Sequence, residues 1–294
     1  PHAIAGDGVL AGQAVIIADV AARQCAKMAD AVDSSEAEAP LLTGGLGGLG
    51  LVTAQLLVND GAQHVVLASR SGRVQQGSGT DWMRLAESEN DVRRVQCDAA
   101  DDASARACVL QLRGAGMRLA GVFHAAHALN DALLANQSAE RFAGTFGPKV
   151  HGGLALQRCA QRERLRHFCA YSSQAGLMGS PGQAPHSASN AWLDAMAHTQ
   201  RALGLPGLSV NWGAVAEVGY AARIGVDRRR SGFEAISRTC TRAVLSRMLA
   251  PGCRGFAVLP ADWSAVFTRV RAAGLVTAWS TLWRPVSAIV DAGP

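Results

Sequence analysis

A short apolar strand, a glycine-rich turn and a helix follow one another near residue 40, and this arrangement constrains the fold more than any other stretch. The segment TGGLGGLG at 43–50 follows two leucines and leads into a helix with apolar residues near every third or fourth position. Glycines at 44, 48 and 50 allow a tight turn in which the backbone approaches a pyrophosphate, while the helix N-terminus supplies N–H groups. We therefore predict a dinucleotide site, the alternative being a glycine-rich turn without a ligand.

Three further strands are predicted downstream of this turn, at 64–68, 92–97 and 119–124. Strands that alternate with helices form a parallel sheet with both faces covered. The expected fold class is therefore α/β, a Rossmann-type doubly wound parallel sheet. Another strand is expected at 208–212 and a last one within 253–263.

The end of the second strand indicates which nicotinamide cofactor the site would take. An NAD site usually places an acid there, whereas this chain has Ser69-Arg70-Ser71. An arginine accommodates a 2′-phosphate, so Arg70 favours NADPH, with an exposed loop arginine as the alternative. Asp98, at the end of the third strand, is placed to meet the adenine.

Composition excludes several other classes of protein. The 294 residues are 49% hydrophobic with 32 glycines, and the formal charge is +5. We expect a soluble, cytoplasmic protein, because no apolar run approaches the 18 residues of a membrane span and no signal pattern is present. The arginine-rich pieces at 162–166 and 228–230 are typical of solvated faces rather than nucleic-acid sites. Seven scattered cysteines predict free core thiols, and no metal site is expected.

The stretch from Tyr171 to Asn190 contains the candidate catalytic groups. A strand ends in Tyr171-Ser172-Ser173, a Gly/Pro loop follows, and a helix is predicted from about Pro185. His186 and Asn190 are four residues apart and therefore share a helix face. A serine at a strand end that faces a helix start is how doubly wound enzymes form a site. Taken alone, each of these side chains is more often structural.

Several segments together make a specific resemblance. Residues 40–265 resemble a ketoreductase domain of a polyketide synthase, in the short-chain dehydrogenase/reductase superfamily; the segments are TGGLGGLG, VVLASRSG, GVFHAAHALNDALL, FGPKVHG, YSSQAGLMGSPGQA, SNAWLDAMAHTQRALGLPGLSVNWG and AVLPADW. Fatty-acid-synthase-type and mycobacterial-type multienzymes carry a similar module. The resemblance implies a helical lid at about 213–250.

The resemblance also implies an activity and its residues. In the family, a β-ketoacyl thioester on the phosphopantetheine arm of an acyl carrier protein accepts hydride from NADPH, within a synthase that has neighbouring domains. Lys149, Ser173 and Asn190 match the family's lysine, serine and asparagine. The expected cofactor-binding residues are Thr43, Gly44, Gly45, Leu46, Gly48, Leu49, Ser69, Arg70, Asp98, Ala99, His124, Ala125 and Ala126.

The position of the family's catalytic tyrosine holds His186. An imidazole ends roughly 2 Å closer to the backbone than a phenol oxygen, and a misplacement of that size costs about 100-fold in rate. A neutral imidazole is also a poor acid. Tyr171 lies two residues before Ser173 and offers no replacement. We therefore predict that reduction is absent or impaired; the alternatives are an active reductase that uses His186, a silent NADPH-binding structural module and an epimerase-like variant.

Stereochemistry and domain limits are the remaining expectations. The resemblance assigns stereocontrol to Asp131, Met178 and Gln183. Asp131 keeps the last acid of the family's LDD segment, and Met178 replaces the tryptophan of the opposite type, so the resemblance is to B-type domains.

Residues 1–39 are expected to be a lead-in from an upstream subdomain, with a linker at 33–40, and residues 266–294 a C-terminal helical tail.

Overall fold

The structure is a computed structural model that describes residues 37–216, 232–250, 253, 255–262, 265, 266 and 268. Its centre is one parallel sheet of seven strands in the order β3-β2-β1-β4-β5-β6-β7. The strands are β1 (Ala37–Thr43), β2 (His64–Ser69), β3 (Asp91–Gln96), β4 (Met117–His124), β5 (His167–Ser173), β6 (Gly207–Trp212) and β7 (Gly255–Val258). Strand order reverses between β1 and β4, and such a switch point is where doubly wound sheets bind ligands.

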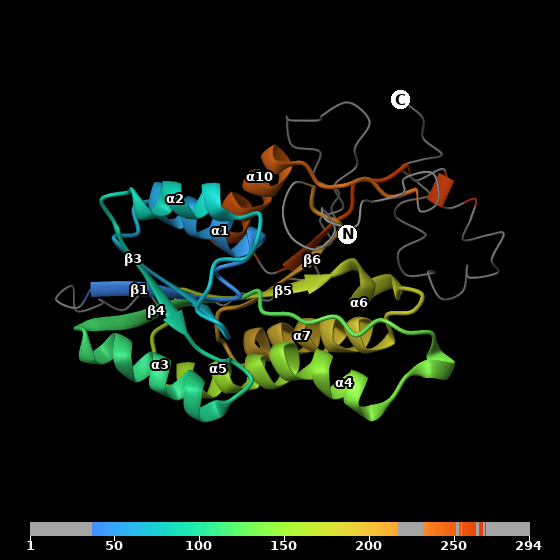
Figure 1. Cartoon of the computed structure of the whole chain (residues 1–294), viewed down its shortest axis with the longest axis horizontal. Helices are drawn as coiled ribbons and strands as arrows, with labels where there is room; N and C mark the ends of the chain where they lie inside the picture. Colours follow the sequence, from blue (N-terminus) through green and yellow to red (C-terminus); the bar gives the residue numbers. More distant parts are fainter. Residues whose placement is uncertain are drawn as a thin grey trace.

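Helices cover both faces of the sheet (Figure 1). One face carries α1 (Gly48–Asn59), α2 (Gly79–Ala86) and α10 (Arg238–Leu249), and the other carries α3 (Asp102–Gly114), α4 (Ala139–Phe146), α5 (Gly152–Ala160) and α7 (Ala184–Ala202). Three short helices, η1 (Leu134–Asn136), the π-helix η2 (Gly147–His151) and α6 (Gln174–Met178), lie between longer elements. The predicted Rossmann-type fold is therefore confirmed.

Two apolar clusters, one on each face, hold the helices to the sheet. Alternate residues of β5 divide between them: Cys169 and Tyr171 pack towards α1 and α10, whereas Phe168 and Ala170 pack towards α3, α5 and α7. This division follows from the two-residue period of a strand. Both faces are apolar at the centre of the sheet, so the central strands appear in the sequence as nearly continuous apolar runs, unlike the edge strand β3.

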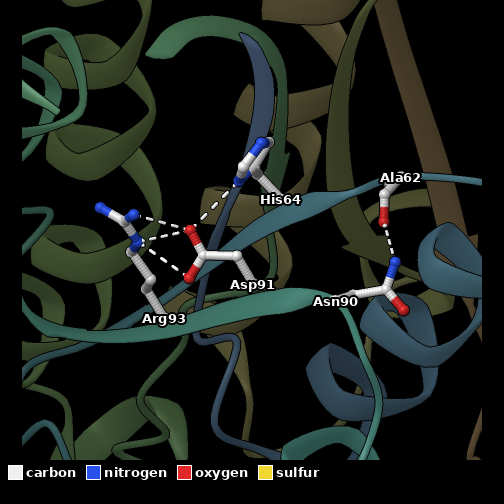
Figure 2. Close-up of polar contacts among 5 residues, drawn as sticks. All are labelled: Ala62, His64, Asn90, Asp91 and Arg93. Carbon is white, nitrogen blue, oxygen red and sulfur yellow. Dashed lines mark hydrogen bonds and ion pairs between the residues drawn. The ribbon is translucent and has the colours of Figure 1, made fainter. Parts of the chain in front are cut away.

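The free edge of the sheet at β3 is charged, unlike its centre. At the amino end of β3, Asp91 accepts hydrogen bonds from Arg93 and lies 3.1 Å from the ring Nδ1 of His64, while Asn90 donates to the Ala62 carbonyl at 3.0 Å (Figure 2). The hydrogen bond from Arg93 lowers the pKa of the Asp91 carboxyl. Charged side chains on an exposed edge strand discourage pairing with another chain.

The structure changes one predicted boundary. The linker expected at 33–40 includes the first four residues of β1, because Ala37 to Ala39 pair with Met117 to Leu119 of β4. Glu38 is held there by Arg118 and by Arg166, the latter at 2.9 Å. The polar composition of this segment predicted a linker. It could not reveal the strand, because the paired residues of β4 lie some 80 residues later in the sequence.

Other predicted segments fall partly outside the described residues. Within the expected lid, 217–231 lie outside them, whereas α10 packs in the apolar cluster beside α1 through Val244, Leu245 and Met248. The lead-in 1–36 and tail residues 269–294 also lie outside them.

Candidate active site

The glycine-rich turn after β1 forms a cradle in which side chains would not fit. Gly44 has a φ of +69°, and a Cβ there would lie 2.7 Å from the Ala125 backbone. A Cβ on Gly50 would lie 2.6 Å from the Gly44 carbonyl oxygen, and one on Gly45 would lie 2.6 Å from the Leu42 carbonyl oxygen. The turn therefore brings β1, β4 and the start of α1 together at backbone distance. Gly45 is a third crowded position that the spacing argument did not single out.

Lys149 lies on the π-helix η2, beside the carboxyl ends of β4 and β5. Its side chain is only 3% exposed, and its Nζ donates a hydrogen bond to the Tyr171 carbonyl at 3.0 Å. Burial lowers its pKa to about 8, while the charge of Asp194 acts in the opposite direction. Single π-turns are frequent at functional sites. The structure thus excludes the alternative that Lys149 is a surface charge.

His124, at the end of β4, connects the glycine turn to this π-helix. Its Nε2 lies 3.0 Å from the Lys149 carbonyl, and because a carbonyl only accepts, Nε2 carries the proton. Nδ1 is then an acceptor, and the Thr43 hydroxyl donates to it at 2.7 Å. Burial lowers the pKa of His124 to about 4, so the ring is neutral. Both ring nitrogens are engaged within the protein, so neither is available to a cofactor.

The strand β5 and the helix α7 bring together the other candidate groups. The Asn190 side-chain amide donates to the His186 carbonyl at 2.7 Å, as expected for residues one turn apart. Ser173 ends β5, and its Oγ accepts the Ala175 amide at 3.2 Å. The side-chain oxygen Oδ1 of Asn190 and the ring Nδ1 of His186 are buried and have no hydrogen-bond partner among the described residues.

The charge state of His186 follows from its surroundings. Burial lowers its pKa to about 3, and the positive charge of Lys149 and the ring of His127 act in the same direction. The imidazole is therefore neutral at physiological pH, as the sequence argument expected. A buried polar atom without a partner is costly, and such atoms mark places where a ligand or water completes the hydrogen bonds.

Comparison with known proteins identifies this architecture. The family model described as "KR domain" matches residues 39–217. A mycocerosic acid synthase-like polyketide synthase of Mycobacterium tuberculosis (strain ATCC 25618 / H37Rv) is 41% identical over 182 residues, which are 62% of this chain and 8% of that protein. The polyketide synthase GfsA of Streptomyces halstedii is 33% identical over 287 residues, 96% of this chain and 4% of that protein. The chain belongs to the KR domain family.

Solved structures agree with this assignment. A structure described as A-type ketoreductases from a modular polyketide synthase superposes on this KR domain with a TM-score of 0.73, at 32% identity, over 81% of this chain and 52% of that chain. A C2-type ketoreductase superposes with a TM-score of 0.67, at 26% identity, over 86% and 54% of the two chains. The chain thus spans about half of these solved chains and less than a tenth of the two synthases.

Two of the three expected stereocontrol residues of this KR domain are joined by a hydrogen bond. The Gln183 side-chain amide donates to the Asp131 carboxylate at 2.9 Å, and the Ala132 amide donates to the Gly182 carbonyl at 2.9 Å. The loop after β4 is therefore fastened to the loop before α7. Met178 ends α6 in the same region.

The expected adenosine side of the KR domain lies at the ends of β2 and β3. Arg70 is exposed directly after β2, and the neighbouring Ser69 hydroxyl is buried without a partner among the described residues. Asp98 follows β3, where its Oδ1 accepts the Ala100 amide at 3.0 Å. The positive charge of Arg70, next in sequence to a buried hydroxyl without a partner among the described residues, would suit the binding of an anionic group such as a phosphate.

The Tyr171 side chain points towards α1, away from the candidate catalytic groups on α7 and η2. Thr53 donates its hydroxyl proton to the Leu49 carbonyl at 2.8 Å, so the Tyr171 hydroxyl, 2.6 Å away, donates to Thr53. Its ring stacks on Trp212 with centroids 5.8 Å apart. The hydroxyl therefore fastens β5 to α1.

Sequence reasoning missed a buried polar network beneath this site. It joins α7 to β5 and β6 through Ser172, Asp194, Ser209 and Asn211. The signals were present: Asp194 is one helical turn beyond Asn190, and Ser209 and Asn211 are two apart on a strand.

In the described part of the chain, no helix is long and apolar enough to cross a membrane, and no group of three His, Cys, Asp or Glu could hold a metal ion.

Proposed function

We propose that this KR domain binds NADPH and carrier-bound β-ketoacyl thioesters but reduces them slowly or not at all. The observation that carries this proposal is His186: a neutral, partly buried imidazole, whose Nδ1 has no partner among the described residues, occupies the position that corresponds by resemblance to the family's proton donor. Asn190 follows one turn later on the same helix, the charge of Lys149 acts on the His186 ring, and Ser173 ends β5.

The cofactor part of the proposal is supported by the cradle after β1. The crowded glycines leave backbone N–H groups at the start of α1 for a pyrophosphate. Arg70 and the Ser69 hydroxyl would hold a 2′-phosphate, which favours NADPH over NADH. When bound, NADPH would supply a hydride to the ketone.

The chain's own residues would orient the ketone and manage the proton. The Ser173 hydroxyl would donate to the ketone oxygen, and the charge of Lys149 would favour negative charge there. The proton itself must come from the position of His186, and general acid catalysis is worth about 10²–10⁴-fold. With its pKa near 3, the His186 ring is a neutral donor at pH 7 and a weak one. The imidazole is also too short to reach the position of a phenol oxygen.

The substrate and partners follow from family membership. We propose that the substrate is a β-ketoacyl chain on the phosphopantetheine arm of an acyl carrier protein, delivered by neighbouring synthase domains. Asp131 accepts a hydrogen bond from Gln183, and in this proposal it would direct substrate entry in the B-type manner. A reduced product of the opposite hand would contradict the B-type assignment.

His186→Tyr tests this function, with His198→Tyr as the matched control on the exposed face of the same helix. We expect both variants and the parent to bind NADPH, measured by its fluorescence. We expect only His186→Tyr to oxidise NADPH with a small β-ketoacyl thioester, at least about 100-fold faster than the parent. A parent that reduces as fast as His186→Tyr would contradict the proposal. Loss of α-deuterium from the thioester without reduction would instead indicate epimerase-like activity.

A further inference from the structure

Asp194 is a carboxylate that faces the interior, one turn beyond Asn190 on α7. It accepts hydrogen bonds from the Ser209 hydroxyl and from the Asn211 side-chain amide, the latter at 2.8 Å. Burial raises the pKa of Asp194, and the hydrogen bonds from Ser209 and Asn211 act in the opposite direction. A buried carboxylate is retained only with partners of this kind.

From Asn211 the network reaches the backbone of two catalytic positions. The Asn211 amide nitrogen lies 3.0 Å from the Ser172 hydroxyl and 3.3 Å from the Ser173 carbonyl. The Ser172 hydroxyl in turn donates to the Asn190 carbonyl at 3.2 Å. Asp194 thereby orients the Asn211 side chain, and Asn211 in turn orients the Ser172 hydroxyl. Through these contacts, one carboxylate fixes the position of the carboxyl end of β5 relative to the start of α7.

The same carboxylate acts on Lys149 through space. Burial lowers the pKa of Lys149, and Asp194 is the charged group that raises it. The other titratable groups that act with Lys149 are His186 on α7 and His124 on β4, and both are neutral. Lys149 also lies close to this network, because its Nζ donates to the Tyr171 carbonyl, one residue before Ser172. The negative charge of Asp194 therefore favours the protonated form of Lys149.

We propose that Asp194 is a positioning residue of this KR domain: through Asn211 and Ser172 it fixes the backbone at Ser173 and Asn190, and by its charge it keeps Lys149 cationic. Asp194 does not contact the reacting atoms in this scheme. Its role in catalysis rests on the proposed function, whereas its effects on the backbone and on Lys149 do not.

Lys149 can be observed directly, because Lys27 and Lys149 are the only lysines among 28 Lys and Arg residues. A Lys27→Arg chain labelled with ε-¹³C lysine gives one lysine NMR signal, whose chemical shift follows the titration. We expect Asp194→Asn to lower its midpoint by about one pH unit, a tenfold change in the proton affinity. Asp60→Asn, an exposed carboxyl after α1, should leave it unchanged. A folded Asp194→Asn protein with an unshifted midpoint would overturn the charge role.

Hydrogen exchange tests the backbone role without any need for activity. Asn211→Ala cuts the link and keeps the carboxylate, so we expect amide exchange in 174–190 to accelerate at least tenfold while the Lys149 midpoint stays in place. Asn59→Ala, at an exposed amide on α1, is the matched control. Unchanged exchange in Asn211→Ala would overturn the positioning role, including in the case where Asp194→Asn does not fold.

Kinetics in the His186→Tyr background connects the network to the reaction. Asp194→Asn and Asn211→Ala should each lower kcat at least tenfold while the Kd for NADPH changes less than twofold, and Asp194→Glu should restore part of kcat. An unchanged kcat would contradict the catalytic role. If His186→Tyr itself is inactive, the proposed function fails, yet the NMR and exchange measurements still decide the role of Asp194.

Discussion

The end of β4 holds a buried histidine and the start of α7 a partly buried one, and the two differ in their hydrogen bonding. Both imidazoles are neutral, with the pKa of His124 lowered to about 4 and that of His186 to about 3, mainly by burial. His124 uses both ring nitrogens within the protein, on Thr43 and on the Lys149 carbonyl. His186 leaves Nδ1 without a partner among the described residues. A fully satisfied histidine is part of the framework, whereas an unsatisfied one marks the place where substrate or water completes the site.

Acid titration is the strongest test of what the two histidines share. Each folded pKa lies below the unfolded value near 6.5, so the unfolded chain binds more protons in this range. The contribution of each histidine to stability is full above pH 6.5 and is lost as pH falls toward 4 for His124 and 3 for His186. We expect the free energy of unfolding to drop by several kcal/mol, at about 1.4 kcal/mol per pKa unit. Urea unfolding from pH 7 to pH 4 measures this.

A His186→Leu variant serves as the control for that titration. Because it lacks one of the two titrating rings, its free energy of unfolding should fall less steeply as pH is lowered. If the slope is the same in the parent and in His186→Leu, the neutral, buried state of His186 is wrong.

Replacing each histidine by leucine separates the two environments. His124→Leu removes the side-chain donor to the Lys149 carbonyl and the acceptor of the Thr43 hydroxyl, and we expect a loss of about 2–4 kcal/mol in stability. His186→Leu removes a buried atom that has no partner, so stability should change by less than about 1 kcal/mol in either direction. Urea unfolding at pH 7 compares them. Equal losses of unfolding free energy in the two variants would contradict the view that His124 is a framework residue and His186 a site residue.

Tyr171→Phe removes a single hydroxyl and tests whether that group takes part in the proposed reaction. The variant loses one buried hydrogen bond to Thr53, worth about 1 kcal/mol, and keeps the stacking on Trp212. In the His186→Tyr background, kcat should stay within twofold of that of the single variant. A large loss of kcat would show that the Tyr171 hydroxyl takes part in the reaction.

Much of the fold could be predicted from local patterns. The strands at 64–68 and 208–212 are short, apolar and nearly uninterrupted, and the structure places β2 and β6 there. The glycine turn predicted the β1–α1 connection because no other residue type fits its crowded backbone. The four-residue spacing of His186 and Asn190 correctly placed them on one helix face.

Long-range pairing could not be predicted in the same way. β1 begins at Ala37, inside a polar stretch, because Glu38 finds Arg118 about 80 residues later. His124 reads as a crevice residue in the sequence, yet its partners at Thr43 and Lys149 make it a connector. The Asp194 network likewise joins residues that are 15 to 39 positions apart.

The sequence by itself determined the sheet type and the glycine-rich turn after β1, because periodicity, glycine and spacing are local properties. The roles of the groups at the site, and the exchange of tyrosine for histidine at position 186, stay predictions that rest on the family resemblance. Only the tertiary structure decided which polar atoms are satisfied: it paired His124, left His186 and Asn190 with buried atoms that lack partners among the described residues, and joined Asp194 through hydrogen bonds to β6 and β5. Hydrogen-bond satisfaction depends on neighbours from distant parts of the chain, and folding alone brings them together.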